Sequence, residues 1–384
     1  MVLLKNRRWI FLFVLVSSFL LLSACQPATS TPEPEPPPKP DPDPEPVRET
    51  IVHIAGWGDA SNGAFPCYWQ DKQKTDLSVC LYPGPVKAEG YAHSVFVSGK
   101  NVYVAGFISC HGKRIACYWK NGARTELKHR AGSAYANSIF ISEKIIYVAG
   151  RIEFQDRAIP CYWKNGVYTE LSLSSPNVSA MANAIFVSGS DVYIAGTYNI
   201  EVGMNPKTEV PCYWKNGERT NLSVLDPTHD GYGNSIFVSE GNVYVAGYVV
   251  DGTNAAVPCY WLNGARTDLS RLIVYSGWAN SIHVSGSDVY IGGVTQSESC
   301  ELVPCYWKNG TRTDLSVVSP GKGGWVNCLF VLGSNVFAAG YSGFDPNQGA
   351  DFAVPCYWKN GVRTDLKLGI YPGAFANAIY VTYK

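Results

Sequence analysis

The sequence predicts an all-β fold, a seven-bladed β-propeller of four-stranded blades that is closed by pairing of the N- and C-terminal strands. Three observations support this prediction. A unit of 44 to 51 residues repeats from Ile51 onward, and repeats of this length are typical of solenoids and propellers. Each unit contains four short strand patterns and shows no helical period. The chain also begins and ends partway through a unit, which a closed ring would complete.

Four sequence blocks predict the strands of each unit. Ser-Ile-Phe-Val is followed by a Ser-Gly-Ser-Asp turn and by Val-Tyr-Val-Ala-Gly, the second strand. Pro-Cys-Tyr-Trp forms the third strand, and Lys-Asn-Gly predicts a tight hairpin into the fourth strand, Arg-Thr-Asp-Leu. We expect the tryptophans to pack between blades. The Cys-Tyr-Trp triplet marks all seven units and begins at Cys67, Cys117, Cys161, Cys212, Cys259, Cys305 and Cys356.

The two ends of the repeat region are complementary. The chain enters the region at the second strand of a unit, residues 52–56, and its last strand pattern, residues 376–381, is the first strand of a unit. Seven complete blades therefore require these two segments to share one sheet. On this ground we expect residues 51–384 to form one propeller domain.

Residues 1–24 are expected to be a signal peptide that is removed. Lys5, Arg7 and Arg8 precede an apolar stretch that is too short to span a bilayer comfortably. Residues 22–25, Leu-Ser-Ala-Cys, match the lipobox of bacterial lipoproteins at all four positions. This resemblance implies that Cys25 carries diacylglycerol, with palmitate-like acyl chains, and becomes the first residue after cleavage. The alternative is an ordinary cleaved signal with an accidental cysteine.

Residues 25–50 combine the predicted lipidated cysteine with a stalk that is rich in proline and glutamate. Ten prolines between residues 27 and 46 are incompatible with helix or sheet, and like-charged carboxylates favour an extended spacer. The lipid anchor makes a membrane the expected partner. The predicted location is the bacterial cell envelope outside the cytoplasm, at the outer membrane or the cell surface.

Two families of repeats resemble this unit. The segment Val-Tyr-Ile-Gly-Gly, which ends at Gly293, looks like the double-glycine strand of Kelch repeats. The segment from Cys305 to Leu315 is similar to the Leu-Trp-x-x-Gly-x-x-x-Asp-Leu of bacterial extracellular HAF-type repeats. Six units lack the Kelch double glycine, and the Leu-Gly-Thr-Leu-Gly-Gly tail of HAF-type repeats is missing. The resemblance implies a propeller on a surface protein and no particular ligand.

Charge and cysteine positions limit the kinds of ligand and of covalent bond that the sequence predicts. The formal net charge is zero, which predicts no field that would attract nucleic acid or anionic lipid. The seven Cys-Tyr-Trp cysteines occupy equivalent positions, too far apart for disulfides, and should pack as buried hydrophobic residues. Cys80 and Cys110 fall in neighbouring loops on one face, where a disulfide is possible. No pattern predicts a metal site or a cofactor.

The variable loops, which connect strands 2–3 and 4–1, are expected to share one face and to carry function. An aromatic residue and an asparagine each recur in six units where the first strand begins, and we expect them to ring the mouth of the central channel. Two interpretations are open: the rings and amides bind a sugar or a peptide backbone, or they cap the strand and pack beneath it. The candidate residues are Tyr91, His93, Tyr135, Asn137, Asn183, Tyr232, Asn234, Trp278, Asn280, Trp325, Asn327, Phe375 and Asn377.

The sequence contains no recognisable catalytic motif, and on this ground the chain is predicted not to be an enzyme. The favoured function is a membrane-anchored interaction module, expected to be a monomer, that binds a protein or a glycan through the variable-loop face. The alternatives are a scaffold in envelope assembly, resembling propeller lipoproteins of outer-membrane barrel insertion, and an enzyme acting on polysaccharide.

Overall fold

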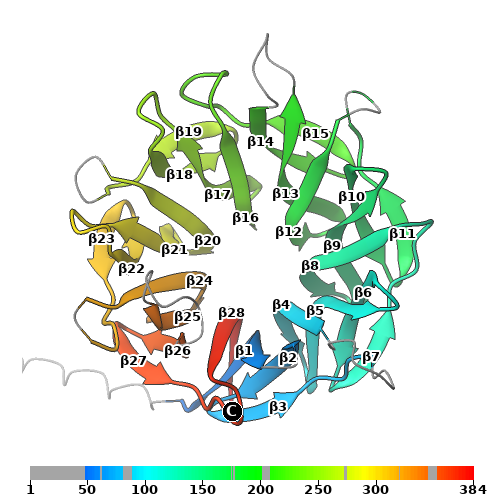
Figure 1. Ribbon diagram of the computed structural model, residues 1–384. Helices are drawn as coiled ribbons and strands as arrows, with labels where there is room; N and C mark the ends of the chain where they lie inside the picture. The colour runs from blue at the N-terminus through cyan, green and yellow to red at the C-terminus, as the bar shows by residue number, and fades with distance from the viewer. Residues whose placement is uncertain are drawn as a thin grey trace, which may run out of the picture. The chain divides into compact units, whose positions relative to one another are not determined.

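Seven antiparallel sheets of four strands each form the blades of a propeller, which confirms the predicted fold (Figure 1). The computed structural model describes residues 48–60, 63–80, 89–173, 175, 178–200, 208–271, 275–319, 321–344 and 353–384. These belong to one unit, Arg48–Lys384, and the unit Met1–Val47 lies outside the described residues. Within the described residues, the structure has no helix of the length and apolarity that crossing a bilayer requires.

Each blade runs from an inner first strand to an outer fourth strand. Blades 1 to 4 consist of β28 (Gly373–Tyr383), β1 (Thr50–Ala60), β2 (Gly63–Gln70), β3 (Gln73–Asp76); β4 (Glu89–Ser98), β5 (Asn101–Cys110), β6 (Lys113–Lys120), β7 (Ala123–Glu126); β8 (Ser133–Ser142), β9 (Ile145–Phe154), β10 (Arg157–Lys164), β11 (Val167–Glu170); and β12 (Ala180–Ser188), β13 (Asp191–Ile200), β14 (Thr208–Lys215), β15 (Glu218–Asn221). Blades 5 to 7 consist of β16 (Gly231–Ser239), β17 (Asn242–Val250), β18 (Ala256–Leu262), β19 (Ala265–Asp268); β20 (Gly277–Ser285), β21 (Asp288–Gln296), β22 (Leu302–Lys308), β23 (Thr311–Asp314); and β24 (Gly323–Leu332), β25 (Asn335–Phe344), β26 (Val354–Lys359), β27 (Val362–Asp365).

Short turns gather on one face of the propeller, the turn face. It holds the connections between strands 1 and 2 and between strands 3 and 4 of each blade, and the opposite face is the variable-loop face. In the hairpin between β6 and β7, Asn121 and Gly122 have φ of 49° and 84°, as a type I′ turn requires. Asn121 also accepts a hydrogen bond from the amide of Val102, with N···O of 2.8 Å. The Asn-Gly pair therefore fixes the register of the outer hairpin.

The two ends of the propeller pair in blade 1, as predicted. The inner strand β28 lies antiparallel to β1, in a register that runs from Thr50 opposite Tyr383 to Asp59 opposite Gly373. Ile379 and Val381 are buried against blade 7 in the same cluster as Phe337. The last strand of the chain thus completes the first blade and covers the side of the seventh.

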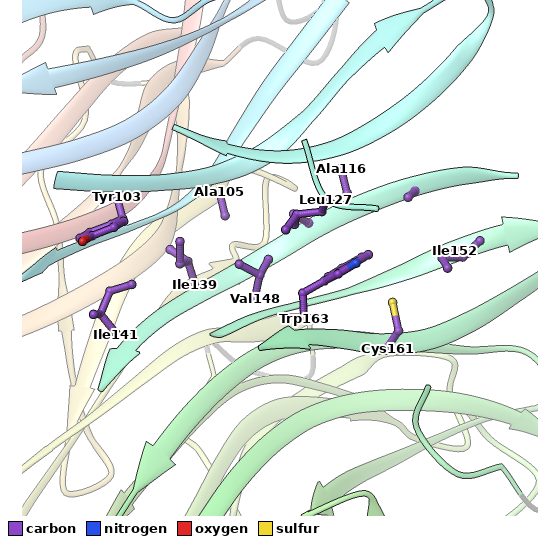
Figure 2. Packing of buried hydrophobic residues seen from close by; sticks show 12 residues of the cluster. Tyr103, Ala105, Ala116, Leu127, Ile139, Ile141, Val148, Ile152, Cys161 and Trp163 are labelled. Atoms are coloured by element: carbon purple, nitrogen blue, oxygen red, sulfur yellow. The ribbon is translucent and has the colours of Figure 1, made fainter. Parts of the chain in front are cut away.

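The core lies between blades rather than inside them. Figure 2 shows Tyr103 and Leu127 of blade 2 facing Val148 and Trp163 of blade 3 in one buried cluster. The seven tryptophans of the third strands are at most 1% exposed, and each indole Nε1 donates to a carbonyl of the preceding blade over 2.7–3.1 Å. The adjacent cysteines are fully buried, and burial raises the pKa of thiols such as Cys117. These repeated residues hold neighbouring blades together.

An aromatic collar runs around the inner strands of the seven blades. One ring from the inner strand of each blade contacts the next, with centroids 4.7–5.0 Å apart, and the circuit closes. Its members are Phe96, Phe140, Phe186, Phe237, His283, Phe330 and Tyr380. Only His283 can take up a proton here, because the other six rings belong to Phe or Tyr.

Blade 4 lacks an ion pair that recurs on the outer strands of five other blades. In five blades a Lys or Arg pairs with the acid two residues later, as in Arg266 and Asp268. In blade 4, Asn221 replaces the acid, while Arg219 still stacks 3.8 Å from the centroid of the Tyr198 ring. Among the described residues, the buried Nη1 of Arg219 has no hydrogen-bond partner. A buried donor left in this way destabilises the fold.

Asn221→Asp should therefore stabilise the protein. The new carboxylate completes the ion pair that five other blades have, and we expect the free energy of unfolding to rise by roughly 1 kcal/mol. Urea denaturation measures the change. The matched control is Asp268→Asn, which breaks the same pair in blade 5 and should shift the midpoint in the opposite direction. An unchanged or lowered midpoint for Asn221→Asp would contradict this account of Arg219.

Candidate functional site

The asparagines predicted at the channel mouth form a ring of hydrogen bonds between blades. The Nδ2 atom of each donates to a backbone carbonyl of the next blade over 2.8–3.0 Å. For example, Asn377 of blade 1 bonds to Ala92 of blade 2. His93 takes this place in blade 2 and bonds to the backbone of Ala136. The six asparagines are Asn137, Asn183, Asn234, Asn280, Asn327 and Asn377.

A β-bulge places each of these side chains. In blade 2 the pairing of β4 with β5 shifts between Ala92 and Ser94, which leaves His93 as the extra residue. The bulge brings the Tyr91 carbonyl against Gly106, where a Cβ atom would lie only 1.9 Å from the carbonyl oxygen. The repeated glycine of the second strand is thus needed for the bulge, and the bulge turns the Asn or His toward the next blade. This geometry is that of the capping interpretation, and a ligand-binding role for the amides stays a prediction.

The six predicted aromatic residues reach the mouth to different degrees. Tyr135 is 3% and Phe375 is 9% exposed, so both rings are packed away from solvent. Neither ring offers an open surface, and a ligand-binding role for these two residues stays a prediction. Tyr91, Tyr232, Trp278 and Trp325 are only partly buried and offer part of each ring at the mouth.

A second set of aromatic residues was missed by the sequence prediction. It occupies the position directly after the repeated glycine of the second strand, opposite the predicted ring. Trp57 stacks on Phe375 at 4.4 Å between centroids, and Tyr248 stacks on Tyr232 at 4.7 Å. The sequence contains a signal for this set, because four of the seven repeated glycines directly precede Trp, Phe or Tyr. The other three precede Arg151, Thr197 and Val294.

The two sets join into one arc, the mouth belt, which crosses six blades. Contacting rings are 4.4–6.5 Å apart between centroids, and Trp325 lies opposite Tyr341 in the register of blade 7. The arc is open at blade 4, where Met181 and Thr197 take the two positions. In order from blade 3 to blade 5, the belt is Tyr135, Phe107, Tyr91, Trp57, Phe375, Tyr341, Trp325, Trp278, Tyr248 and Tyr232.

Charged side chains surround the blade 3 end of the mouth belt. The hydroxyl of Tyr135 donates to Glu153 over 2.7 Å, and Arg114 donates to the same hydroxyl. Arg151 lies 4.0 Å from the centroid of the Tyr135 ring and pairs with Glu153 over 3.2 Å. Burial is the main cause that raises the pKa of Tyr135, and the hydrogen bond to Glu153 raises it further. The group presents guanidinium and carboxylate groups beside the aromatic surface.

Cys80 and Cys110 form a disulfide on the variable-loop face, with Cα atoms 5.6 Å apart. The two sulfurs and His111 are the one cluster of potential metal ligands among the described residues. Because the sulfurs are bonded to each other, they supply no thiolate to a metal ion. Cys25 and residues 1–24, the predicted signal peptide, lie outside the described residues.

Comparison with known proteins gives no family. No protein-family model and no curated protein sequence matches the chain, so the resemblance to Kelch and HAF-type repeats has no support beyond the propeller fold. Among solved structures, the chain is similar to a thermostable family-43 glycoside hydrolase. The identity is 12%, the TM-score is 0.37, and the match covers 60% of this chain and 93% of the hydrolase.

That finding corrects one prediction. A solved structure similar to this chain is a hydrolase, which contradicts the prediction that the chain is not an enzyme. At this TM-score the likeness carries no argument about which reaction or ligand this chain would use. The propeller itself suits a binding or scaffold module.

Proposed function

We propose that the protein is a glycan-binding module and that the partly exposed rings of the mouth belt are its binding surface. The observation that carries this proposal is the pair of tryptophans on blades 6 and 7. The rings of Trp278 and Trp325 lie 5.5 Å apart between centroids, at an angle of 32°, and both are partly exposed. Two partly exposed rings on neighbouring blades form a platform on which the apolar face of a sugar can stack.

Polar groups at the blade 3 end of the mouth belt suit a ligand rich in hydroxyl groups. Arg114, Arg151 and Glu153 supply donors and acceptors at one end of the mouth belt. Ligand sites commonly combine aromatic walls with a few placed polar groups that fix orientation. A protein ligand would also use tryptophan and arginine, so the experiment below uses sugars directly.

Trp278→Ala and Trp325→Ala should each weaken sugar binding. Because tryptophans supply large contact surfaces, we expect a loss of about 1–3 kcal/mol in binding free energy for the better ligands. Isothermal titration with cellohexaose, xylohexaose and mannohexaose, together with a thermal melt of each variant, measures binding and folding separately. The melting temperature should change little, since both rings are partly exposed.

The control lies on the turn face. Lys215→Glu and Lys308→Glu change exposed residues next to the hairpin turns of blades 4 and 6, and sugar binding should remain at the wild-type level. Loss of binding in these variants, with normal binding in the tryptophan variants, would place the site on the opposite face. Absence of binding to every oligosaccharide by the wild-type protein would remove the support for a glycan ligand.

We also propose that a lipid on Cys25 anchors the chain outside the cytoplasm in a bacterial envelope. The support is the match of residues 22–25 to a lipobox and the proline-rich stalk that follows. Several acyl chains on one residue hold a protein firmly in a membrane. Cys25→Ala should therefore move the protein to the soluble fraction or leave the signal peptide uncleaved, which fractionation and mass spectrometry detect. Normal membrane retention of a processed Cys25→Ala variant would refute the anchor.

A further inference from the structure

Charge is unevenly distributed on the turn face, although the chain as a whole is neutral. In blades 4 to 6 the turns carry two basic and four acidic side chains. In blades 7, 1, 2 and 3 the turns and the two ends of the propeller carry three acidic and eight basic side chains. We call these eight the basic sector: Arg48, Lys72, Lys100, Lys120, Lys144, Lys164, Lys359 and Lys384. A sum over the whole sequence conceals this separation.

The repeat shows why the two halves differ. In blade 4 the third-strand lysine, Lys215, pairs with Asp191 across the turn face over 2.9 Å. Blade 6 repeats this pair with Lys308 and Asp288 over 2.8 Å. Blades 2, 3 and 7 have Asn101, Ile145 and Asn335 in place of the aspartate.

Without that acid, the lysines of blades 2, 3 and 7 keep an uncompensated charge. Each ammonium lies 5.5 Å from an aromatic centroid of its own blade. Among the described residues, none of the three has a carboxylate within the 4.0 Å of an ion pair. All three are exposed. They are Lys120, Lys164 and Lys359.

The chain also enters the propeller within the basic sector. The second strand of blade 1 begins at Thr50 on the turn face, and the amide of Lys384 donates to the Glu49 carbonyl over 3.0 Å. Whatever precedes Arg48 is therefore joined to the propeller at this face. The mouth belt lies on the opposite face.

We propose that the basic sector docks on an anionic lipid surface. Exposed lysines near a membrane that contains anionic lipids each contribute to attraction over about one Debye length, and a basic patch is the usual second signal beside a lipid anchor. The positive charge alone would suit any polyanion. The choice of a lipid surface rests on the proposed Cys25 anchor. Docking would direct the mouth belt away from the bilayer.

Vesicle sedimentation tests the proposal with residues 26–384, which carry the whole propeller and no acyl group. Vesicles of phosphatidylglycerol and phosphatidylcholine should retain about tenfold more protein than vesicles of phosphatidylcholine alone. Salt at about 0.5 M screens surface charge and should abolish this difference. The test variant is Lys120→Gln/Lys164→Gln/Lys359→Gln, which should lose most of the retention. The matched control, Lys113→Gln/Arg130→Gln/Arg157→Gln, removes the same charge from the variable-loop face and should behave as wild type.

The outcomes separate this inference from the other proposals. Equal retention by both kinds of vesicle, or full retention of the turn-face variant, overturns lipid docking and leaves sugar binding at the mouth untouched. Binding to soluble polyglutamate but not to the anionic vesicles also overturns it, because the basic sector would then recognise an acidic macromolecule. Equal thermal melts of the two triple variants ensure that a loss of retention reports charge and not unfolding.

Discussion

Deletion of residues 376–384 is expected to abolish cooperative unfolding. These residues include most of β28, and their removal takes Ala376, Ile379 and Val381 out of the cluster that joins blade 1 to blade 7. Burial of each large aliphatic side chain contributes roughly 1.5–3 kcal/mol, and the whole domain is stable by only about 5–15 kcal/mol. The deletion also exposes the edge of β1 from Thr50 to Gly56, which favours aggregation.

Further bonds would be lost with the same segment. Asn377 supplies the hydrogen bond that links blade 1 to blade 2 in the asparagine ring, and Tyr380 closes the aromatic collar between Phe96 and Phe330. We therefore expect a soluble aggregate, or a chain whose far-ultraviolet circular dichroism changes gradually on heating.

A shorter deletion provides the control. Removal of Tyr383 and Lys384 takes away two exposed residues and the pair between Lys384 and Glu49, and should leave a sharp melt close to that of the wild type. If the long deletion melted at the same temperature with the same sharpness, the ring would not depend on its terminal strands.

Acid should destabilise the propeller through two histidines that replace the consensus residue of the repeat. Burial lowers the pKa of His283 to about 4, and burial together with nearby Arg151 lowers the pKa of His93 to about 4. In the unfolded chain both groups titrate near 6.5. The unfolded state therefore binds more protons between these values, so stability is fully present above pH 6.5 and falls as the pH drops toward 4. The loss is on the order of 2–3 kcal/mol for each histidine.

The repeat supplies the substitutions that test this. His93→Asn restores the residue of the other six blades, and His283→Phe restores the commonest residue of the aromatic collar. The double variant should resist acid, with the midpoint of acid unfolding moved to lower pH and stability at pH 7 almost unchanged. His53, whose pKa burial also lowers, remains as a smaller source of acid sensitivity. Parallel acid titrations of wild type and double variant with the same midpoint would show that these two histidines do not control the transition.

The repeat made the fold predictable from the sequence, because the pattern of each strand recurs in all seven units. Lys-Asn-Gly predicts the outer hairpins, and the partial units at the two ends predict the pairing of β28 with β1. The role of the asparagines was harder to predict. Asn137 bonds to Ala182 only because of a β-bulge, and no local sequence pattern predicts that bulge. Sequence spacing gives the position of a side chain along a strand but not the neighbour across a blade boundary.

The candidate site was predicted only in part for the same reason. Tyr91 and Trp278 were found because their positions repeat. Trp57 and Tyr248 were missed because they vary among blades and meet their partners only in the register of the folded sheet. The missing acid of blade 4 is visible as Arg-Thr-Asn in the sequence, but the buried Nη1 of Arg219 needs the structure. Whole-chain charge likewise conceals the basic sector.

The position of β1 also determines how the protein would resist a mechanical pull. Force applied through residue 48, against a ligand held at the mouth belt, acts along the axis of β1. That strand lies between β28 and β2 and is hydrogen-bonded to both. A strand loaded along its axis is sheared, so bonds of both ladders must break together, whereas an outer strand such as β3 could be peeled away one bond at a time. Because forced unfolding depends on the height of the unfolding barrier, a tether attached to the second strand of a blade should hold longer than one attached at the rim.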